Sequence, residues 1–127
     1  MLLVYYPSPN TVLLMQNKSQ IEFWNGDTGR NWVAYDTLMD AMLQPIGEAV
    51  LDALRFEAHA RALDIGCGCG LPTLSLATRI GPGGCVTGGD ISAPMLSVAR
   101  EPTATNKHKG ASINFLEVDA QVYPFEP

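Results

Sequence analysis

Three glycines at alternate positions, Gly66, Gly68 and Gly70, form the part of this sequence best suited to ligand chemistry. An apolar run that contains one acid, Asp64, comes directly before them, and Pro72 opens a stretch that is compatible with a helix. A strand that turns through glycines into a helix N-terminus brings bare backbone close to a ligand, because no Cβ intervenes. The sequence therefore predicts a loop that binds a nucleotide or a nucleoside.

Each strand that the sequence predicts has a carboxylate at or near its carboxyl end: Asp64, Asp90 and Asp119. In an open parallel sheet, ligands bind outside the carboxyl ends of the strands. We therefore expect the three acids to lie along one rim of the sheet, beside the glycine loop.

The residues around the glycines do not match the common phosphate-binding loops. A loop for nucleoside triphosphates needs a lysine after its last glycine, whereas Leu71 and Pro72 follow Gly70 here. A dinucleotide loop needs Gly-x-Gly-x-x-Gly, whereas this loop reads Gly-x-Gly-x-Gly, although Asp90 follows at a distance compatible with a ribose contact. Asp64 would also repel a pyrophosphate. A ligand with an adenine, a ribose and a positive charge, but no phosphate, fits the three acids.

Helices are expected over most of residues 19–55, upstream of the loop. Residues 25–29 are typical of a turn, and apolar residues from Trp32 to Leu43 recur at the three- and four-residue spacing of an amphipathic helix. Pro45 suits the first turn of a further helix. We expect these helices to pack over one end of the sheet.

Strands and helices alternate beyond the loop. A helix is expected over 73–80, a strand over 85–90, a second helix with Ser92 as its N-cap, and a strand over 113–118. Pro102 should end or kink the second helix early. This order predicts an α/β fold with a parallel sheet and right-handed crossovers.

Four segments resemble the class I S-adenosylmethionine-dependent methyltransferases of the bacterial small-molecule type. They are LDIGCGCG (63–70), VTGGDIS (86–92), FLEVDA (115–120) and the upstream IEFWNGDTGRNWVAY (21–35). The resemblance implies a Rossmann-like fold, S-adenosylmethionine as cofactor with S-adenosylhomocysteine as product, and a small-molecule methyl acceptor.

The resemblance also implies which residues bind the cofactor. They are Asp64, Gly66, Cys67, Gly68, Gly70, Asp90, Ile91, Met95, Asp119 and Ala120. The glycine loop would lie against the methionine and ribose parts, with Asp64 near the methionine ammonium, directly or through water. Asp90 would accept both ribose hydroxyls, because a carboxylate can take two hydrogen bonds at once.

The remaining residues of this set are expected at the adenine. Ile91 and Met95 would pack on the ring. Asp119 would accept from the adenine amino group, and the backbone N–H of Ala120 would reach a ring nitrogen. Trp32 and Tyr35 could cap the site, but we expect them to belong to the core of an amphipathic helix. No catalytic residue and no metal ligand is assigned.

The expected domain organisation follows from the same resemblance. Residues 1–18 are expected to be a poorly defined leader, with Met15 as an alternative start, 19–58 a helical lead-in or cap, and 59–127 the first half of the cofactor-binding domain. The family's sheet has seven strands, and only three are predicted here, so the first strand would be an open edge. We therefore expect the N-terminal portion of a longer enzyme, or a homo-oligomer that completes the sheet.

The composition limits which partners and which cellular location fit this sequence. The net charge of −5 disfavours a general nucleic-acid surface, and the apolar start is too short to cross a bilayer. Three cysteines favour a reducing cytoplasm, with Cys67 and Cys69 as small side chains of a crowded turn. Two alternatives stay open: an inactive module that binds cofactor or self-associates, and a nicotinamide-dependent oxidoreductase.

Overall fold

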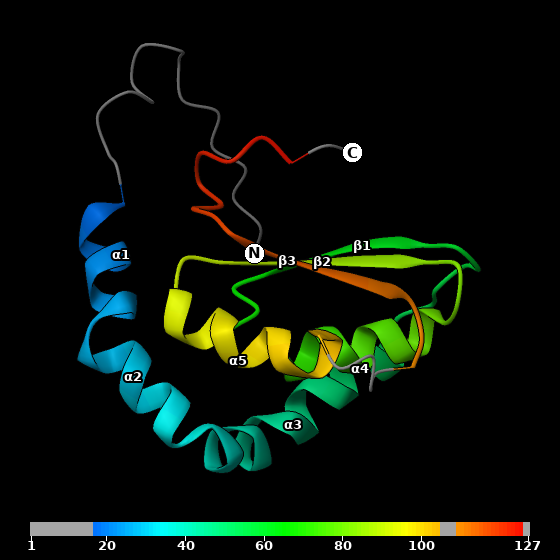
Figure 1. Ribbon diagram of the computed structural model, residues 1–127. Helices are drawn as coiled ribbons and strands as arrows, with labels where there is room; N and C mark the ends of the chain where they lie inside the picture. Colours follow the sequence, from blue (N-terminus) through cyan, green and yellow to red (C-terminus); the bar gives the residue numbers. More distant parts are fainter. Residues whose placement is uncertain (1–16, 105–108, 126–127) are drawn as a thin grey trace.

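The computed structural model describes residues 17–104 and 109–125, so the expected leader lies almost entirely outside the described residues. Three parallel strands form one sheet in the order β1 (Arg61–Ile65), β2 (Cys85–Asp90) and β3 (Ser112–Glu117), as the sequence predicts. All three strands point the same way, so their carboxyl ends meet at one edge, and the glycine loop leaves β1 at that edge (Figure 1).

Two helices cover one face of this sheet: α4 (Leu71–Ile80) and α5 (Ala93–Ala104) (Figure 1). Apolar side chains of both helices are buried against β2 and β3, and they divide into two clusters. The α4 cluster contains Leu76, Ala77, Ile80, Val86 and Ala111, and the α5 cluster contains Cys67, Leu96, Ala99 and Phe115. This packing fixes the loops that leave the strands for the helices.

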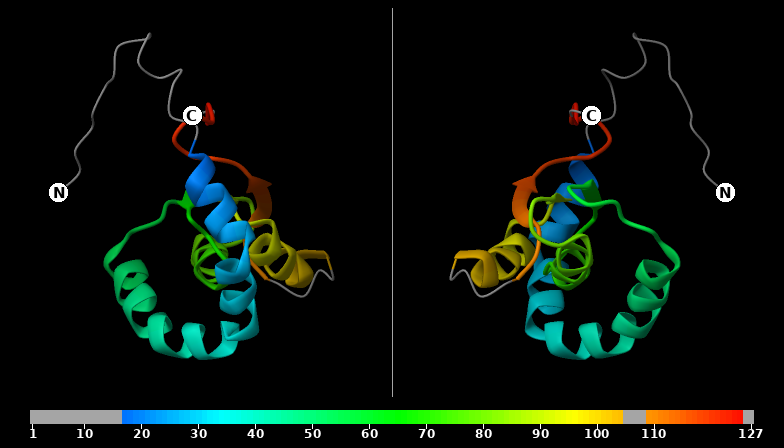
Figure 2. Two further views of the ribbon diagram at one scale, coloured as in Figure 1. Left: turned by 90° about the vertical axis from the view of Figure 1, so that its left-hand side faces the viewer. Right: turned by 90° about the vertical axis from the view of Figure 1, so that its right-hand side faces the viewer.

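The three upstream helices, α1 (Lys18–Asn25), α2 (Asp27–Ala34) and α3 (Asp36–Ala53), form an arc around the rest of the chain (Figure 2). The Asn25 amide at the end of α1 donates to the Ile91 carbonyl at 2.7 Å and accepts from the Ala93 N–H at 2.9 Å. The Ser92 hydroxyl donates to the Trp24 carbonyl at 2.7 Å. Neutral hydrogen bonds thus hold α1 against the start of α5.

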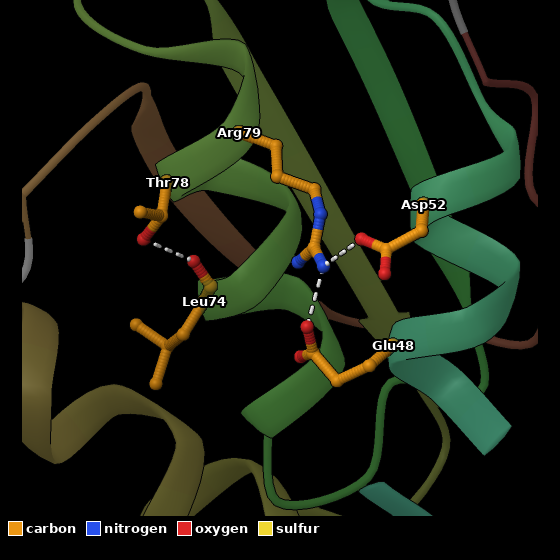
Figure 3. A network of polar contacts seen from close by, with 5 residues as sticks. All are labelled: Glu48, Asp52, Leu74, Thr78 and Arg79. Carbon is orange, nitrogen blue, oxygen red and sulfur yellow. Dashed lines mark hydrogen bonds and ion pairs between the residues drawn. The ribbon is translucent and has the colours of Figure 1, made fainter. Parts of the chain in front are cut away.

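An arginine joins the other end of the arc to α4. The guanidinium of Arg79 donates to the carboxylates of Glu48 and Asp52, both on α3 (Figure 3). The hydrogen bond from Arg79 holds the pKa of Glu48 below its usual range. Leu51, between the two acids, packs against the α4 cluster. An ion-pair network and an apolar contact therefore attach α3.

The expected boundaries of the upstream helices are partly wrong. The expected turn over 25–29 is only a break at Gly26, because α2 begins at Asp27. The expected helix from Trp32 to Leu43 is interrupted at Tyr35, whose backbone leaves the helical conformation. Pro45 starts no new helix but lies inside α3, although a proline there removes one backbone donor and its ring crowds the preceding turn.

The expectations about α5 are correct in part. Ser92 lies at the N-cap position, directly before Ala93. Its hydroxyl donates to the Trp24 carbonyl, and the Asn25 side chain accepts from the Ala93 N–H at the helix start. Pro102 does not end the helix, which continues to Ala104. The third strand begins one residue earlier than expected, at Ser112, and ends at Glu117.

The first strand, β1, lies at an edge of the sheet, as expected, and β3 lies at the other edge. Within the described residues, β1 pairs with β2 alone. Leu63 and Ile65 of β1 are 42% and 59% exposed. No helix in the described part of the chain is both long and apolar enough to cross a membrane.

Gly88 in the middle of β2 makes room for an aromatic ring. A Cβ on Gly88 would stand 2.8 Å from the Phe115 ring and 3.1 Å from the Cys67 sulfur. Glycine weakens an isolated strand, but here it lets the α5 cluster pack against the sheet.

We expect Gly88→Ala to lower the free energy of unfolding by about 1–3 kcal/mol, because the added methyl overpacks the α5 cluster. Denaturant unfolding followed by circular dichroism measures this change. Gly47→Ala in α3 is the matched control, since its Cβ would meet nothing within 4 Å and alanine favours a helix. Equal effects of the two substitutions would contradict the role given to Gly88.

Candidate functional site

The glycine loop turns sharply at the end of β1. Gly66, Gly68 and Gly70 all have positive φ, at 77°, 54° and 89°. A Cβ on Gly70 would stand 2.9 Å from the Cβ of Ala99, so this glycine lets α5 approach the loop. A Cβ on Gly66 would meet nothing within 4 Å. The backbone at Gly66 therefore borders open space that a ligand can fill.

The Asp90 carboxylate links the loops that follow β1 and β2. One oxygen accepts from the Gly68 N–H at 2.8 Å, and the other accepts from the Ser92 N–H at 2.8 Å. A carboxylate has about four lone-pair positions, so two hydrogen bonds leave room for two more. Asp90 can therefore hold the protein's own loops and two ligand hydroxyls together.

Asp64 is engaged within the protein. Its carboxylate accepts from the Thr73 hydroxyl at 2.6 Å, in the first turn of α4. Its negative charge still reaches the loop, because it contributes to the raised pKa of Cys67.

A cavity of about 390 Å³ lies at the carboxyl ends of the strands, and we call it the strand-end cavity. Ligand pockets commonly have volumes of about 300–1,000 Å³, so this cavity is large enough for a small ligand. The Asp90 and Asp119 carboxylates are among its walls, together with apolar side chains. The described residues that line it are Asn17, Trp24, Trp32, Ile65, Gly66, Gly89, Asp90, Ile91, Met95, Val118, Asp119, Ala120 and Gln121.

A second cavity, of about 160 Å³, lies between α3, the glycine loop and the start of α4, and we call it the helix cavity. One face of α3 forms a wall with a polar residue every four positions: Asp36, Asp40, Gln44 and Glu48. Trp32, Gly66 and Met95 line both cavities, so the two spaces adjoin.

The structure brings nine of the ten residues expected at the cofactor to these two cavities. Asp90, Ile91, Asp119 and Ala120 line the strand-end cavity. Cys67, Gly68 and Gly70 line the helix cavity, and Gly66 and Met95 line both. Asp64 contacts Thr73 instead.

Sequence reasoning missed the polar face of α3. The polar residues of this segment recur every four positions, which is the signal that could have identified the polar face. The interpretation of the segment used only the spacing of its apolar residues. Placing Tyr35 in a helical core was wrong, because its side chain is 60% exposed at the break between α2 and α3. Trp32 is partly buried and lines both cavities.

The two loop cysteines are protonated at neutral pH. Burial, with the charges of Asp64 and Asp90, raises the pKa of the Cys67 thiol to about 12. Burial, with a hydrogen bond to Asp36, raises the pKa of the Cys69 thiol to about 12. Nucleophiles and metal ligands are thiolates, so neither role suits these residues. No group of three metal-ligating side chains occurs in residues 17–104 and 109–125.

Comparison with known proteins assigns the family. A family model described as a methyltransferase domain matches residues 62–127, which is more than half of the chain. The chain belongs to this family. The matched segment begins in β1 and includes the glycine loop, β2 and β3. The three parallel strands and their helices are the Rossmann-like fold of the class I methyltransferases.

Curated relatives are longer than this methyltransferase domain. Aklanonic acid methyltransferase DauC of Streptomyces sp. (strain C5) is 30% identical over 90 residues, which is 71% of this chain and 41% of that protein. Demethylmenaquinone methyltransferase of Staphylococcus aureus is 41% identical over 66 residues, 52% of this chain and 26% of that protein. The matched segments thus cover less than half the length of each of these relatives.

Solved structures agree with the fold. A chain of the complex that contains the Haloferax volcanii Trm112 methyltransferase activator matches 84% of this chain and 42% of its own length, with 25% identity and a TM-score of 0.59. The YcgJ protein of Bacillus subtilis matches 62% of this chain and 32% of its own length, with 22% identity and a TM-score of 0.50.

We expect Asp90→Ala to lower the free energy of unfolding by about 2 kcal/mol or more, because two backbone N–H groups lose a charged acceptor. Thermal and urea unfolding measure the loss. Asp119→Ala is the control, since Asp119 accepts one exposed backbone N–H, from Gln121. That variant should lose about 1 kcal/mol or less. A smaller loss for Asp90→Ala than for the control would contradict the linking role of Asp90.

Proposed function

We propose that this chain binds S-adenosylmethionine and forms the cofactor-binding part of a methyltransferase that acts on a small-molecule acceptor. The observation that supports this most is the strand-end cavity, which Asp90 and Asp119 line together with Gly66 of the glycine loop. This arrangement suits an adenosyl ligand without phosphate groups.

The charge around the glycine loop supports a cationic ligand. Asp64 and Asp90 both contribute to the raised pKa of the Cys67 thiol, so the loop lies in a negative field. The same field would oppose a pyrophosphate. A sulfonium ion and an ammonium group would be favoured there.

We assign the ribose and the adenine to the strand-end cavity. Asp90 would accept the two ribose hydroxyls with the lone pairs that Gly68 and Ser92 leave available. Ile91 and Met95 would pack on the adenine. Asp119 would accept a hydrogen bond from the adenine amino group, and the Ala120 N–H would donate to a ring nitrogen.

The glycine loop would lie beside the methionine part, which continues into the helix cavity. Gly66, Cys67, Gly68 and Gly70 line that route. Asp64 would act on the methionine ammonium through water, since Thr73 already donates to its carboxylate.

The reaction depends mainly on the correct positioning of the methyl donor and the acceptor. When bound, the cofactor supplies a methyl group on a positively charged sulfur. The acceptor's nucleophile would attack the methyl carbon in line with the carbon–sulfur bond, and the sulfur would leave. This chain would hold the cofactor in one orientation, and correct placement alone supplies a large part of such a rate acceleration. The α1–α2 pair would limit water access, because Trp24 and Trp32 form walls of the strand-end cavity. We assign no general base to the chain.

A small-molecule acceptor is supported by two kinds of observation. The relatives are named for aklanonic acid and demethylmenaquinone. The chain has a net charge of −5, which does not suit a nucleic-acid partner.

We also propose a cytoplasmic location, because Cys67, Cys69 and Cys85 are all free.

Isothermal titration calorimetry with S-adenosylhomocysteine and with NAD tests the proposed function. We expect S-adenosylhomocysteine to bind and NAD not to bind, because only the former lacks the pyrophosphate that the acidic loop opposes. Binding of NAD alone would assign the site to a nicotinamide-dependent oxidoreductase. A folded chain that binds neither would refute the proposal.

A second candidate is a self-associating module without catalytic activity of its own. The exposed edge of β1 favours it, because Leu63 and Ile65 are exposed on a strand that pairs only with β2 within the described residues. Size-exclusion chromatography with light scattering tests this candidate: it predicts a dimer or larger species. Ile65→Lys should restore the monomer, since a charge on an edge strand opposes pairing. A monomeric wild-type chain would remove this candidate.

A further inference from the structure

The two cavities meet beside a tryptophan. Trp32 of α2, Gly66 of the glycine loop and Met95 of α5 are the described residues that line both the strand-end cavity and the helix cavity. Gly66 has no side chain, and Met95 is apolar and only 5% exposed. Of the three, Trp32 alone presents an aromatic ring, so an indole lies where the two cavities adjoin.

Contacts along α1 and α2 hold this indole in place. The rings of Trp24 and Trp32 pack edge to face, with their centroids 5.8 Å apart. The Trp24 carbonyl accepts a hydrogen bond from the hydroxyl of Ser92, at the start of α5. Gly29, one helical turn before Trp32, lets α2 pass close to α1, because a Cβ at this position would clash with the same carbonyl. Ring packing and backbone contacts therefore position Trp32.

The carboxylates of the two cavities stand on either side of this junction. Among the described residues, none of them lines both spaces: Asp36, Asp40 and Glu48 line only the helix cavity, and Asp90 and Asp119 line only the strand-end cavity. A cation at the junction would therefore contact the indole, with carboxylates further away on both sides. The face of an indole attracts a cation through its π-system. Unlike a carboxylate, it offers no ionised oxygen that would attack a reactive methyl group.

We propose that Trp32 binds the positively charged sulfur of the cofactor through a cation–π contact, and that this contact makes the site prefer the methyl donor to the product, whose sulfur is uncharged. This inference rests on the proposed function, in which the adenosine occupies the strand-end cavity and the methionine part continues into the helix cavity. The sulfur is bonded to both parts, so it lies at the junction. Methyl transfer removes the charge from the sulfur, so the attraction to the indole is lost as the product forms. This loss favours exchange of the product for new cofactor.

Calorimetry with S-adenosylmethionine and S-adenosylhomocysteine isolates the charge on the sulfur. The two ligands differ only by the methyl group and the charge that it gives to the sulfur, so contacts to the adenosine and to the amino-acid part cancel in the ratio of their dissociation constants. We expect Trp32→Leu to shift this ratio by about 3- to 30-fold against S-adenosylmethionine. Leucine still packs against a methyl group, so the shift reports the loss of the contact with the charge.

Two further variants complete this test. Met95→Leu changes a side chain at the same junction without removing an aromatic ring, so it should leave the ratio unchanged. Trp32→Phe keeps a ring with a weaker cation–π contact, so its ratio should lie between those of the wild type and Trp32→Leu. Circular dichroism shows whether each variant is folded. If Trp32→Leu does not fold, Trp32→Phe decides the question, with an expected shift of about twofold or more.

An unchanged ratio in folded Trp32→Leu, or in folded Trp32→Phe where that variant decides, would overturn the assignment, and so would an equal shift in Met95→Leu. In these cases the wild-type chain still binds both ligands, so the proposed function stands. A folded wild-type chain that binds neither ligand would instead refute the proposed function, and the assignment would fail with it.

Discussion

The carboxylate of Asp90 connects the parts of this chain that surround the strand-end cavity. It stands at the end of the central strand and accepts backbone N–H groups from the loop after β1 and from the start of α5. The start of α5 is also where Asn25 and the Trp24 carbonyl bind. The glycine loop, the central strand and the first helix therefore share one anchor. The residue that we propose to accept the ribose hydroxyls would therefore also hold the loops around them in place.

Acidic groups surround the ligand space while few cations face it. The negative charges of Asp64 and Asp90 contribute to the raised pKa of Cys67 in the glycine loop, and those of Asp36 and Asp40, on α3, contribute to the raised pKa of Cys69. A protein that binds phosphate through a glycine loop needs the opposite charge at this place. The fold alone would allow several nucleotide ligands, so the charge of the loop is what narrows the choice to a cationic adenosyl compound.

The sequence was most informative where local geometry decides the structure. Alternate glycines after an apolar run allow only a sharp turn, and the acids at 90 and 119 follow strands whose apolar pattern is clear. These features predicted the three parallel strands, their order and nine of the residues that line the two cavities. Where tertiary contacts compete with a local preference, the sequence was less informative. Ser92 precedes α5 as its type predicts, but the sequence does not show that its hydroxyl donates to the carbonyl of Trp24 in α1. Pro45 usually marks a helix start, yet α3 runs through it, and the packing of Leu51 and the ion pairs of Arg79 hold the part of α3 that follows it.

The two ends of the helical arc are held by different forces. The α1 end depends on hydrogen bonds between neutral groups at Asn25 and Ser92. The α3 end depends on Arg79, which is a quarter exposed, and on two carboxylates that are more exposed still. Dissolved ions screen partly exposed pairs much more than neutral hydrogen bonds. Rising ionic strength would therefore loosen the arc at α3 first, so that the helix cavity opens toward solvent while the strand-end cavity keeps the wall that α1 forms.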